Sequence, residues 1–127
     1  MSPPVLVVED ETVNLELVVA LLEKANCQVL TATSAKDAIR VAASERPDLI
    51  LMDLQLPGMT GYEATRQLKA HPATTGIPVV ALTADVTKGA EARAKEAGCS
   101  AFLTKPINRQ ALLETLRRFL PDRPRGA

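Results

Sequence analysis

The sequence has no excess charge of either sign, because its 15 basic and 15 acidic residues cancel. This balance gives no reason to expect sequence-independent binding to nucleic acid or to an anionic membrane surface. No apolar run approaches the ~20 residues that a membrane-spanning helix needs. The first residues, MSPP, contain neither the basic stretch nor the apolar core of a secretory signal. We therefore expect a cytoplasmic protein without nucleic-acid or membrane partners.

Cysteine is scarce as well. Cys27 and Cys99 form no CxxC pair and do not have the spacing of metal ligands. Each precedes a short apolar run, where a small buried thiol is the common interpretation. The fold proposed below places the two runs at opposite edges of a sheet, so we expect no disulfide between them.

The sequence does contain enough apolar residues for a core, since 46% of its 127 residues are hydrophobic. A chain of this length forms one ordinary domain. Short runs rich in Val, Ile and Leu, without strict apolar–polar alternation, predict strands covered on both faces. These runs are residues 5–8, 29–31, 49–52, 79–82 and 101–103.

Segments with helical spacing follow each apolar run. They are residues 12–25, 34–45, 60–70 and 88–97, and a last helix that Asn108 caps. Strands and helices that alternate in this way predict an α/β fold: a parallel sheet with right-handed crossovers and helices on both faces. We expect a single domain over residues 1–120 and a flexible C-terminal tail over residues 121–127.

Chemically capable side chains gather where the apolar runs end. Glu9 and Asp10 follow the first run, Asp53 the third, Thr83 the fourth and Lys105 the fifth. An open parallel sheet binds ligands outside the carboxyl ends of its strands, so all five side chains are expected at one edge. Clustered carboxylates repel unless a cation intervenes, and oxygen ligands suit Mg²⁺. The combination predicts a carboxylate that accepts a phosphoryl group.

Each of these residues also has an ordinary structural interpretation. Glu9 or Asp10 could cap the helix that follows, and Asp53 could be a loop acid before the turn LPGMTG. Thr83 and Lys105 could be plain strand-end residues. Their joint occurrence at the ends of four runs is what these interpretations explain poorly.

Four motifs in order, VVEDE, LILMDLQLPGMTG, VVALTA and FLTKP, resemble the receiver domains of two-component response regulators. The pattern EDExxN, which includes Asn14, is similar to stand-alone cell-cycle receivers and to the receivers of hybrid histidine kinases. The resemblance implies a flavodoxin-like, doubly wound sheet of five strands in the order 2-1-3-4-5, with five helices in a three-layer sandwich. It also implies a regulatory phosphoprotein that promotes its own phosphorylation and slow dephosphorylation, and not an enzyme.

The resemblance assigns roles to the acids and the lysine. Asp53 matches the phosphoryl acceptor, and Lys105 matches the residue that contacts the phosphoryl group. Asp10, Asp53 and the backbone carbonyl of Gln55 match the ligands of Mg²⁺, for which Mn²⁺ can substitute. Glu9 stands where aspartate is commoner and would assist through water.

The resemblance also implies a switch. Thr83 and Phe102 match the hydroxyl and aromatic pair, although Phe102 has no hydroxyl of its own. Ala84 matches the small residue that leaves room for the phosphoryl group, and Pro106 is expected after a cis peptide. The face formed by the fourth helix, fifth strand and fifth helix is expected to change for a downstream protein partner.

The implied donor of the phosphoryl group is a histidine kinase or a histidine phosphotransfer protein. One alternative is a relay domain that passes the group on to another histidine, and another is a scaffold that acts without phosphorylation. An aspartyl-phosphate hydrolase usually has a second acid where this chain has Gln55. A flavodoxin-like cofactor protein needs a phosphate-binding loop where this chain has acids, and no GxGxxG is present.

Overall fold

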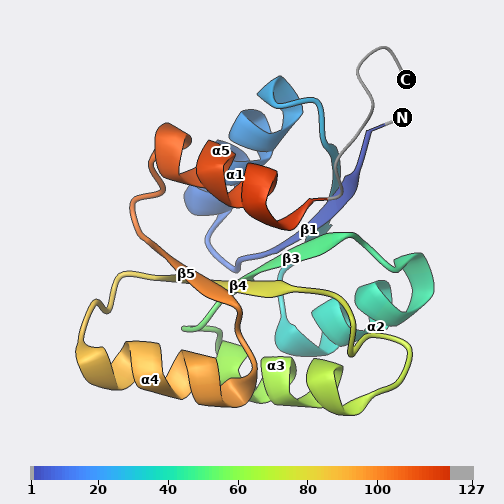
Figure 1. Cartoon of the computed structure of the whole chain (residues 1–127), viewed down its shortest axis with the longest axis vertical. Helices are drawn as coiled ribbons and strands as arrows, with labels where there is room; N and C mark the ends of the chain where they lie inside the picture. Colours follow the sequence, from blue (N-terminus) through green and yellow to red (C-terminus); the bar gives the residue numbers. More distant parts are fainter. Residues whose placement is uncertain (1, 121–127) are drawn as a thin grey trace.

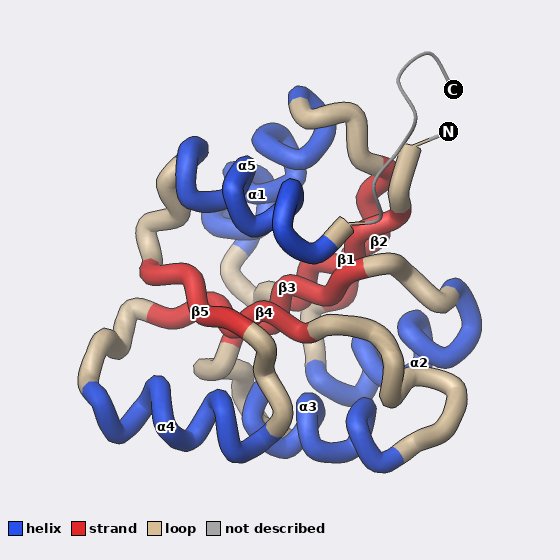
Figure 2. The backbone as a smooth tube through the Cα atoms, viewed as in Figure 1, coloured by secondary structure: helices blue, strands red, loops and turns tan. Residues whose placement is uncertain are grey.

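The computed structural model describes residues 2–120, which form a five-stranded parallel sheet between two layers of helices (Figures 1 and 2). The elements are β1 (Pro4–Val8), α1 (Thr12–Lys24), β2 (Gln28–Ala32), α2 (Ala35–Glu45), β3 (Leu49–Asp53), α3 (Gly61–Ala70), β4 (Val79–Thr83), α4 (Lys88–Ala97), β5 (Ala101–Thr104) and α5 (Arg109–Phe119). None of these helices has the length and apolar character needed to cross a membrane. The tail expected over residues 121–127 lies outside the described residues.

The strand order confirms the expected topology. The sheet runs β2-β1-β3-β4-β5, and each neighbouring pair is parallel. Helices α1 and α5 cover one face, and α2, α3 and α4 cover the other (Figure 1). Cys27 precedes β2 and Cys99 precedes β5, so the two thiols lie at opposite edges of the sheet and form no disulfide.

Four helices begin at a side chain that accepts a backbone N–H three residues further on, which satisfies one donor that the first helical turn leaves unpaired. These N-cap residues are Ser34, Thr60, Thr87 and Asn108. Helix α1 differs, because its N-cap residue is Glu11, whose side chain makes no capping hydrogen bond. Glu9 and Asp10 therefore do not cap α1, and the alternative interpretation of these acids is wrong.

Alternate residues of the central strands supply two separate cores. Leu6 and Val8 of β1 belong to the cluster under α2, α3 and α4, whereas Val5 and Val7 belong to the cluster under α1 and α5. Every residue of β3 and β4 is buried, as predicted. The same prediction is wrong for the edge strands, because β2 exposes Gln28 and Thr31 at an edge where no further strand pairs with it.

Candidate functional site

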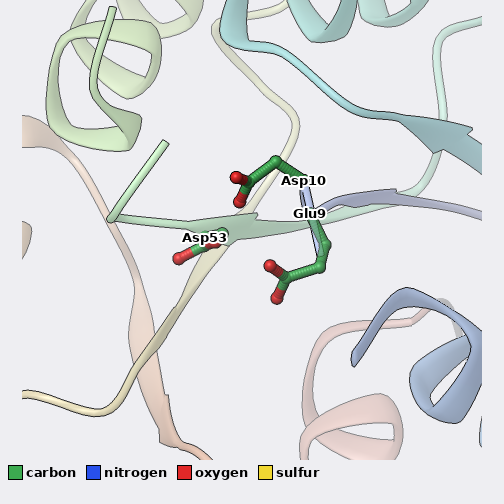
Figure 3. A group of neighbouring side chains, drawn as sticks. All are labelled: Glu9, Asp10 and Asp53. Atoms are coloured by element: carbon green, nitrogen blue, oxygen red, sulfur yellow. The ribbon is translucent and has the colours of Figure 1, made fainter. Parts of the chain in front are cut away.

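The site lies at the edge of the sheet where the parallel strands end. The register pairs Val8 of β1 with Met52 of β3, and Asp53 with Leu82 of β4, so the residues that follow these strands emerge at one level. Figure 3 shows the side chains of Glu9, Asp10 and Asp53 extending from the ends of β1 and β3 into one region. One carboxylate oxygen from each of the three lies within 4.8 Å of the others. The sequence-based prediction of an acidic cluster is thus confirmed as an arrangement in space.

Two of these carboxylates are buried, which makes their ionised forms energetically unfavourable. Glu9 and Asp53 are each 1% exposed, whereas Asp10 reaches solvent. Burial raises the pKa of Glu9, and the adjacent Asp53 raises it further, against the opposing effect of Lys105. The cluster therefore holds more negative charge than its surroundings neutralise.

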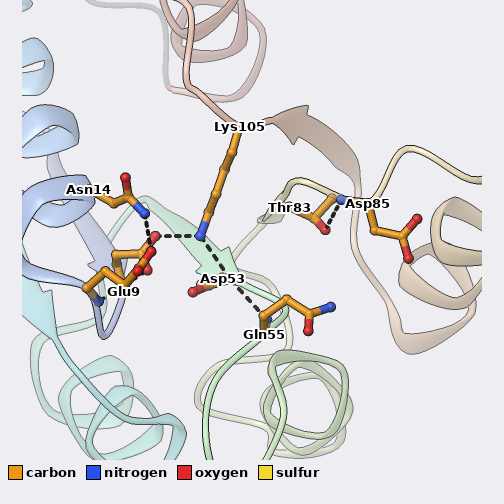
Figure 4. A network of polar contacts seen from close by, with 8 residues as sticks. Glu9, Asn14, Asp53, Gln55, Thr83, Asp85 and Lys105 are labelled. Carbon is orange, nitrogen blue, oxygen red and sulfur yellow. Dashed lines mark hydrogen bonds and ion pairs between the residues drawn. The ribbon is translucent and has the colours of Figure 1, made fainter.

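Lys105 is the cation of this cluster. Its Nζ lies 2.8 Å from Oε1 of Glu9 and 3.2 Å from Oδ1 of Asp53, and its side chain is 16% exposed (Figure 4). Burial alone would lower the pKa of Lys105, but the contact with Glu9 and the charges of the two carboxylates outweigh it and raise the pKa. The ammonium thus bridges the ends of β1 and β3 from the loop after β5.

Asp53 is oriented by a second donor. The backbone N–H of Gln55 donates to Oδ1 of Asp53 at 2.9 Å, the same oxygen that faces Lys105. This bond fixes the direction of the carboxylate at the start of the loop that leads to α3. The predicted role of the Gln55 carbonyl as a metal ligand stays a prediction.

The cluster has the properties of a site for a hard divalent cation. Oε1 of Glu9 is fully buried and makes no aligned hydrogen bond, so its contact with Lys105 leaves it able to accept another positive partner. Carboxylate oxygens from three residues, one of them open to solvent, match the ligands that Mg²⁺ and similar ions prefer. Glu9, Asp10 and Asp53 could therefore hold such an ion together.

The expected switch residues, Thr83 and Phe102, lie on the neighbouring strands β4 and β5. Thr83, the last residue of β4, is fully buried, and its Oγ1 accepts the backbone N–H of Asp85 at 3.0 Å (Figure 4). Ala84 is exposed at the start of the following loop. Phe102 of β5 is partly buried; it packs against the core under α2, α3 and α4 and lines a cavity of about 340 Å³.

The expected cis peptide between Lys105 and Pro106 is present. The structure therefore brings Glu9, Asp10, Asp53 and Lys105 together, and it places Thr83 at the end of β4, the strand next to β3, and Phe102 on the edge strand β5.

Sequence reasoning did not identify Gly61, the first residue of α3. A β-carbon at this position would lie 2.2 Å from the backbone oxygen of Asp53 and 2.8 Å from Cα of Leu54. Glycine therefore lets α3 start directly against the chain that follows the site. The available signal was the glycine that closes LPGMTG, immediately after the capping Thr60.

Comparison with known proteins agrees with this geometry. A family model described as the response regulator receiver domain matches residues 5–117. The polar-differentiation response regulator DivK of Brucella ovis is 38% identical over 122 residues, which cover 96% of this chain and 99% of that protein.

Solved structures are similar over nearly the whole chain. One is the receiver domain of the sensor histidine kinase PA1611 from Pseudomonas aeruginosa, which has a magnesium ion coordinated in its active-site cleft. The match has a TM-score of 0.88 and 34% identity, and it covers 94% of this chain and 98% of that one. A second similar structure is the complex of the histidine phosphotransfer protein Ypd1 with the receiver domain of Ssk1, both from Saccharomyces cerevisiae. The match has a TM-score of 0.86 and 30% identity, and it covers 93% of this chain and 88% of the matched chain.

Proposed function

Since the chain belongs to the response regulator receiver domain family, we propose that it is a signalling switch that accepts a phosphoryl group on Asp53 from a histidine kinase or a histidine phosphotransfer protein. Receiver domains are regulatory phosphoacceptors of two-component signalling, which is the general part of this assignment. One observation carries the specific part: Asp53 is a buried carboxylate whose Oδ1 is held by the ammonium of Lys105 and the N–H of Gln55.

The transfer needs a nucleophile and compensation for negative charge. An oxygen of the Asp53 carboxylate attacks the phosphorus of a phosphohistidine; the new O–P bond forms as the N–P bond breaks, and its electron pair returns to the imidazole. Lys105 offsets the charge of the incoming phosphoryl oxygens from its position 3.2 Å from Asp53. In the loose transition state of phosphoryl transfer, the protein contributes mainly by positioning the reactants and by stabilising the negative charge.

A metal ion would complete the charge balance. Glu9, Asp10, Asp53 and the carbonyl of Gln55 would hold Mg²⁺, or Mn²⁺ in its place, and the bound ion would supply positive charge to the acids and the phosphoryl oxygens. Two observations support this fit: the buried oxygen of Glu9, which has only the ion pair with Lys105 and no aligned hydrogen bond, and the magnesium in the cleft of the PA1611 receiver domain.

The switch would follow from the new acceptor oxygens on Asp53. Thr83 would turn its hydroxyl toward them, and the room that it vacates at the end of β4 would let Phe102 of β5 move inward. The surface formed by α4, β5 and α5 would then favour a different protein partner, because the phosphoryl group shifts an existing equilibrium between two arrangements.

Exposed apolar residues support docking of a protein donor beside the site. Among residues 2–120 the large exposed apolar side chains are Val13, Leu17 and Val86, which are 78%, 42% and 66% exposed. Val13 and Leu17 lie one turn apart on α1, just after Asp10, and Val86 lies in the loop after β4. Exposed apolar side chains on the elements that follow β1 and β4 fit a helical partner that presents a phosphohistidine. The complex of the Ssk1 receiver domain with Ypd1 provides a precedent for this kind of partner.

Intact-mass spectrometry tests the proposal. The protein is incubated with acetyl phosphate and Mg²⁺, and a mass increase of one phosphoryl group is expected. Asp53→Asn should abolish the increase, whereas the matched change Asp37→Asn on the exposed side of α2 should not affect it. An adduct that persists in Asp53→Asn, or no adduct in the unsubstituted protein, would contradict the assignment of the acceptor.

A further inference from the structure

Three hydrogen bonds between side chains and backbone follow one another from Thr83 to the first turn of α4. Oγ1 of Thr83 accepts the N–H of Asp85 at 3.0 Å, and Oδ1 of Asp85 accepts the N–H of Thr87 at 3.0 Å. Oγ1 of Thr87 then accepts the N–H of Ala90 at 3.1 Å. The donor residue of each bond is the acceptor residue of the next. The bonds therefore form a continuous chain from the end of β4 to the start of α4, and Figure 4 shows the first of them.

The two ends of this chain are held by packing, but its middle is not. Thr83 is 0% exposed and Ala90 is 4% exposed, whereas all residues from 84 to 89 are exposed. A loop without buried side chains keeps its shape through its local hydrogen bonds, since no core contact replaces them. The position of Thr87, which caps α4, thus depends on Asp85.

We propose that Asp85 is a positioning residue that transmits the movement of Thr83 to the N-terminus of α4. The proposal rests on the proposed function, because the movement begins when a phosphoryl group on Asp53 accepts the Thr83 hydroxyl. A hydroxyl donates one hydrogen bond while it accepts others, so Thr83 keeps the N–H of Asp85 as it turns. The Asp85 carboxylate then draws Thr87 along, and Oγ1 of Thr87 moves away from the packed Ala90.

The chemistry of Asp85 suits this role. The hydrogen bonds from Thr87 lower the pKa of Asp85, and the charge of Arg93 lowers it further, so the side chain is an ionised acceptor. An ionised acceptor holds a backbone N–H more strongly than a neutral one does. The guanidinium of Arg93 also lies 4.2 Å from the ring centroid of Tyr62 on α3. That contact keeps the body of α4 on α3 while its first turn yields.

Residue-resolved amide hydrogen exchange tests the transmission. Exchange is measured by NMR with Mg²⁺, with and without continuously supplied acetyl phosphate, and intact mass gives the fraction of adduct. In the unsubstituted protein the adduct should speed exchange at Ala90 about fivefold, which corresponds to the loss of one N-cap hydrogen bond.

Two substitutions at Asp85 separate its hydrogen bond from its charge. Asp85→Ala removes the acceptor, so exchange at Thr87 should become faster and the adduct should change exchange at Ala90 less than about twofold, well under the effect of a lost cap. Asp85→Asn keeps a side-chain oxygen and removes the charge, and it should retain most of the response at Ala90. Thr87→Ser keeps the cap and should respond like the unsubstituted protein.

The outcomes distinguish the two proposals. If Asp85→Ala carries the adduct and responds at Ala90 as the unsubstituted protein does, the transmission through Asp85 is refuted and the proposed function stands. If Asp85→Asn carries the adduct but loses the response together with Asp85→Ala, a side-chain acceptor at this position is not enough for the transmission, which also refutes the proposal. If the unsubstituted protein forms no adduct, both proposals fail.

Discussion

Replacing Lys105 by methionine would remove the positive charge from the acidic pocket while keeping a side chain of similar length. At an effective dielectric constant of about 20, the contacts at 2.8 Å and 3.2 Å correspond to gross attractions of roughly 6 and 5 kcal/mol. The substitution also removes the cost of desolvating the ammonium, several kcal/mol, which offsets much of this lost attraction. Because the Lys105 side chain is 16% exposed, we expect a net loss near the lower end of the range for a broken buried pair, about 3 kcal/mol.

Urea unfolding followed by circular dichroism measures this loss. In EDTA near neutral pH, Lys105→Met should lower the free energy of unfolding by about 3 kcal/mol. The pKa of Glu9 lies above its ordinary value of 4.5, so this carboxyl is neutral in the acid range and its repulsion disappears there. The difference between the two proteins should therefore shrink as the pH falls through the raised pKa of Glu9, which lies above 4.5, and should be smallest below pH 4.5.

At alkaline pH the contribution of Lys105 to stability should fall as the pH rises. The pKa of Lys105 is raised above 10.5, so the stability that its charge contributes is complete below pH 10.5 and is lost as the pH rises through the folded-state value. The unsubstituted protein should show this alkaline loss, and Lys105→Met should not.

Magnesium and a control variant complete the test. Added Mg²⁺ should restore part of the stability that Lys105→Met loses, because a second cation enters the same cluster of acids. Lys36→Met, at an exposed position of α2, should change stability by less than about 0.5 kcal/mol. A loss that is the same near neutral pH and below pH 4.5 would refute the electrostatic reasoning, as would a loss that Mg²⁺ does not reduce.

Three further changes have distinct expected outcomes. Glu9→Gln should raise the metal-free stability near neutral pH, because the raised pKa of Glu9 shows that its charge is disfavoured, and it should weaken Mg²⁺ binding about tenfold in calorimetric titration. The double substitution Val13→Lys and Leu17→Lys should slow phosphoryl transfer from a histidine kinase at least ~10-fold relative to transfer from acetyl phosphate. The kinase is chosen by profiling a panel of histidine kinases. Equal slowing of both reactions would contradict docking on α1. Gly61→Ala should lower the free energy of unfolding by about 1–3 kcal/mol, because its β-carbon meets backbone at 2.2 Å, whereas Gly76→Ala, with no atom within 4 Å, should not.

The secondary structure could be predicted from the sequence wherever one physical cause dominated. The run at residues 49–52 predicts β3 because a strand buried on both faces must be continuously apolar. The prediction for α4, residues 88–97, matches the observed bounds. The predicted starts at Ser34 and Thr60 are one residue early, because these residues cap their helices from an extended conformation. The exposure of β2 was missed although the expected strand order places it at an edge, since every apolar run was taken to be covered on both faces.

The candidate site could be predicted as far as strand ends determine it. Glu9, Asp53 and Lys105 meet because parallel strands end at one edge, which spacing along the chain is enough to establish. The closer contact of Lys105 with Glu9 than with Asp53 depends on side-chain rotamers and loop backbone, which spacing does not encode. The hydrogen bond from the N–H of Asp85 to Thr83 also depends on local backbone geometry. The same is true of the close approach of Gly61 to the backbone of Asp53 and Leu54.

The contact between Arg93 and Tyr62 has a practical consequence for observing the protein in solution. The chain contains one tyrosine and no tryptophan, so its near-ultraviolet emission comes almost entirely from a single ring. Tyr62 is 4% exposed, and its ring lies under the guanidinium of Arg93 from the neighbouring helix. Any displacement of α4 across α3 would alter the surroundings of this one chromophore, so the unlabelled protein carries an optical reporter of its own rearrangement.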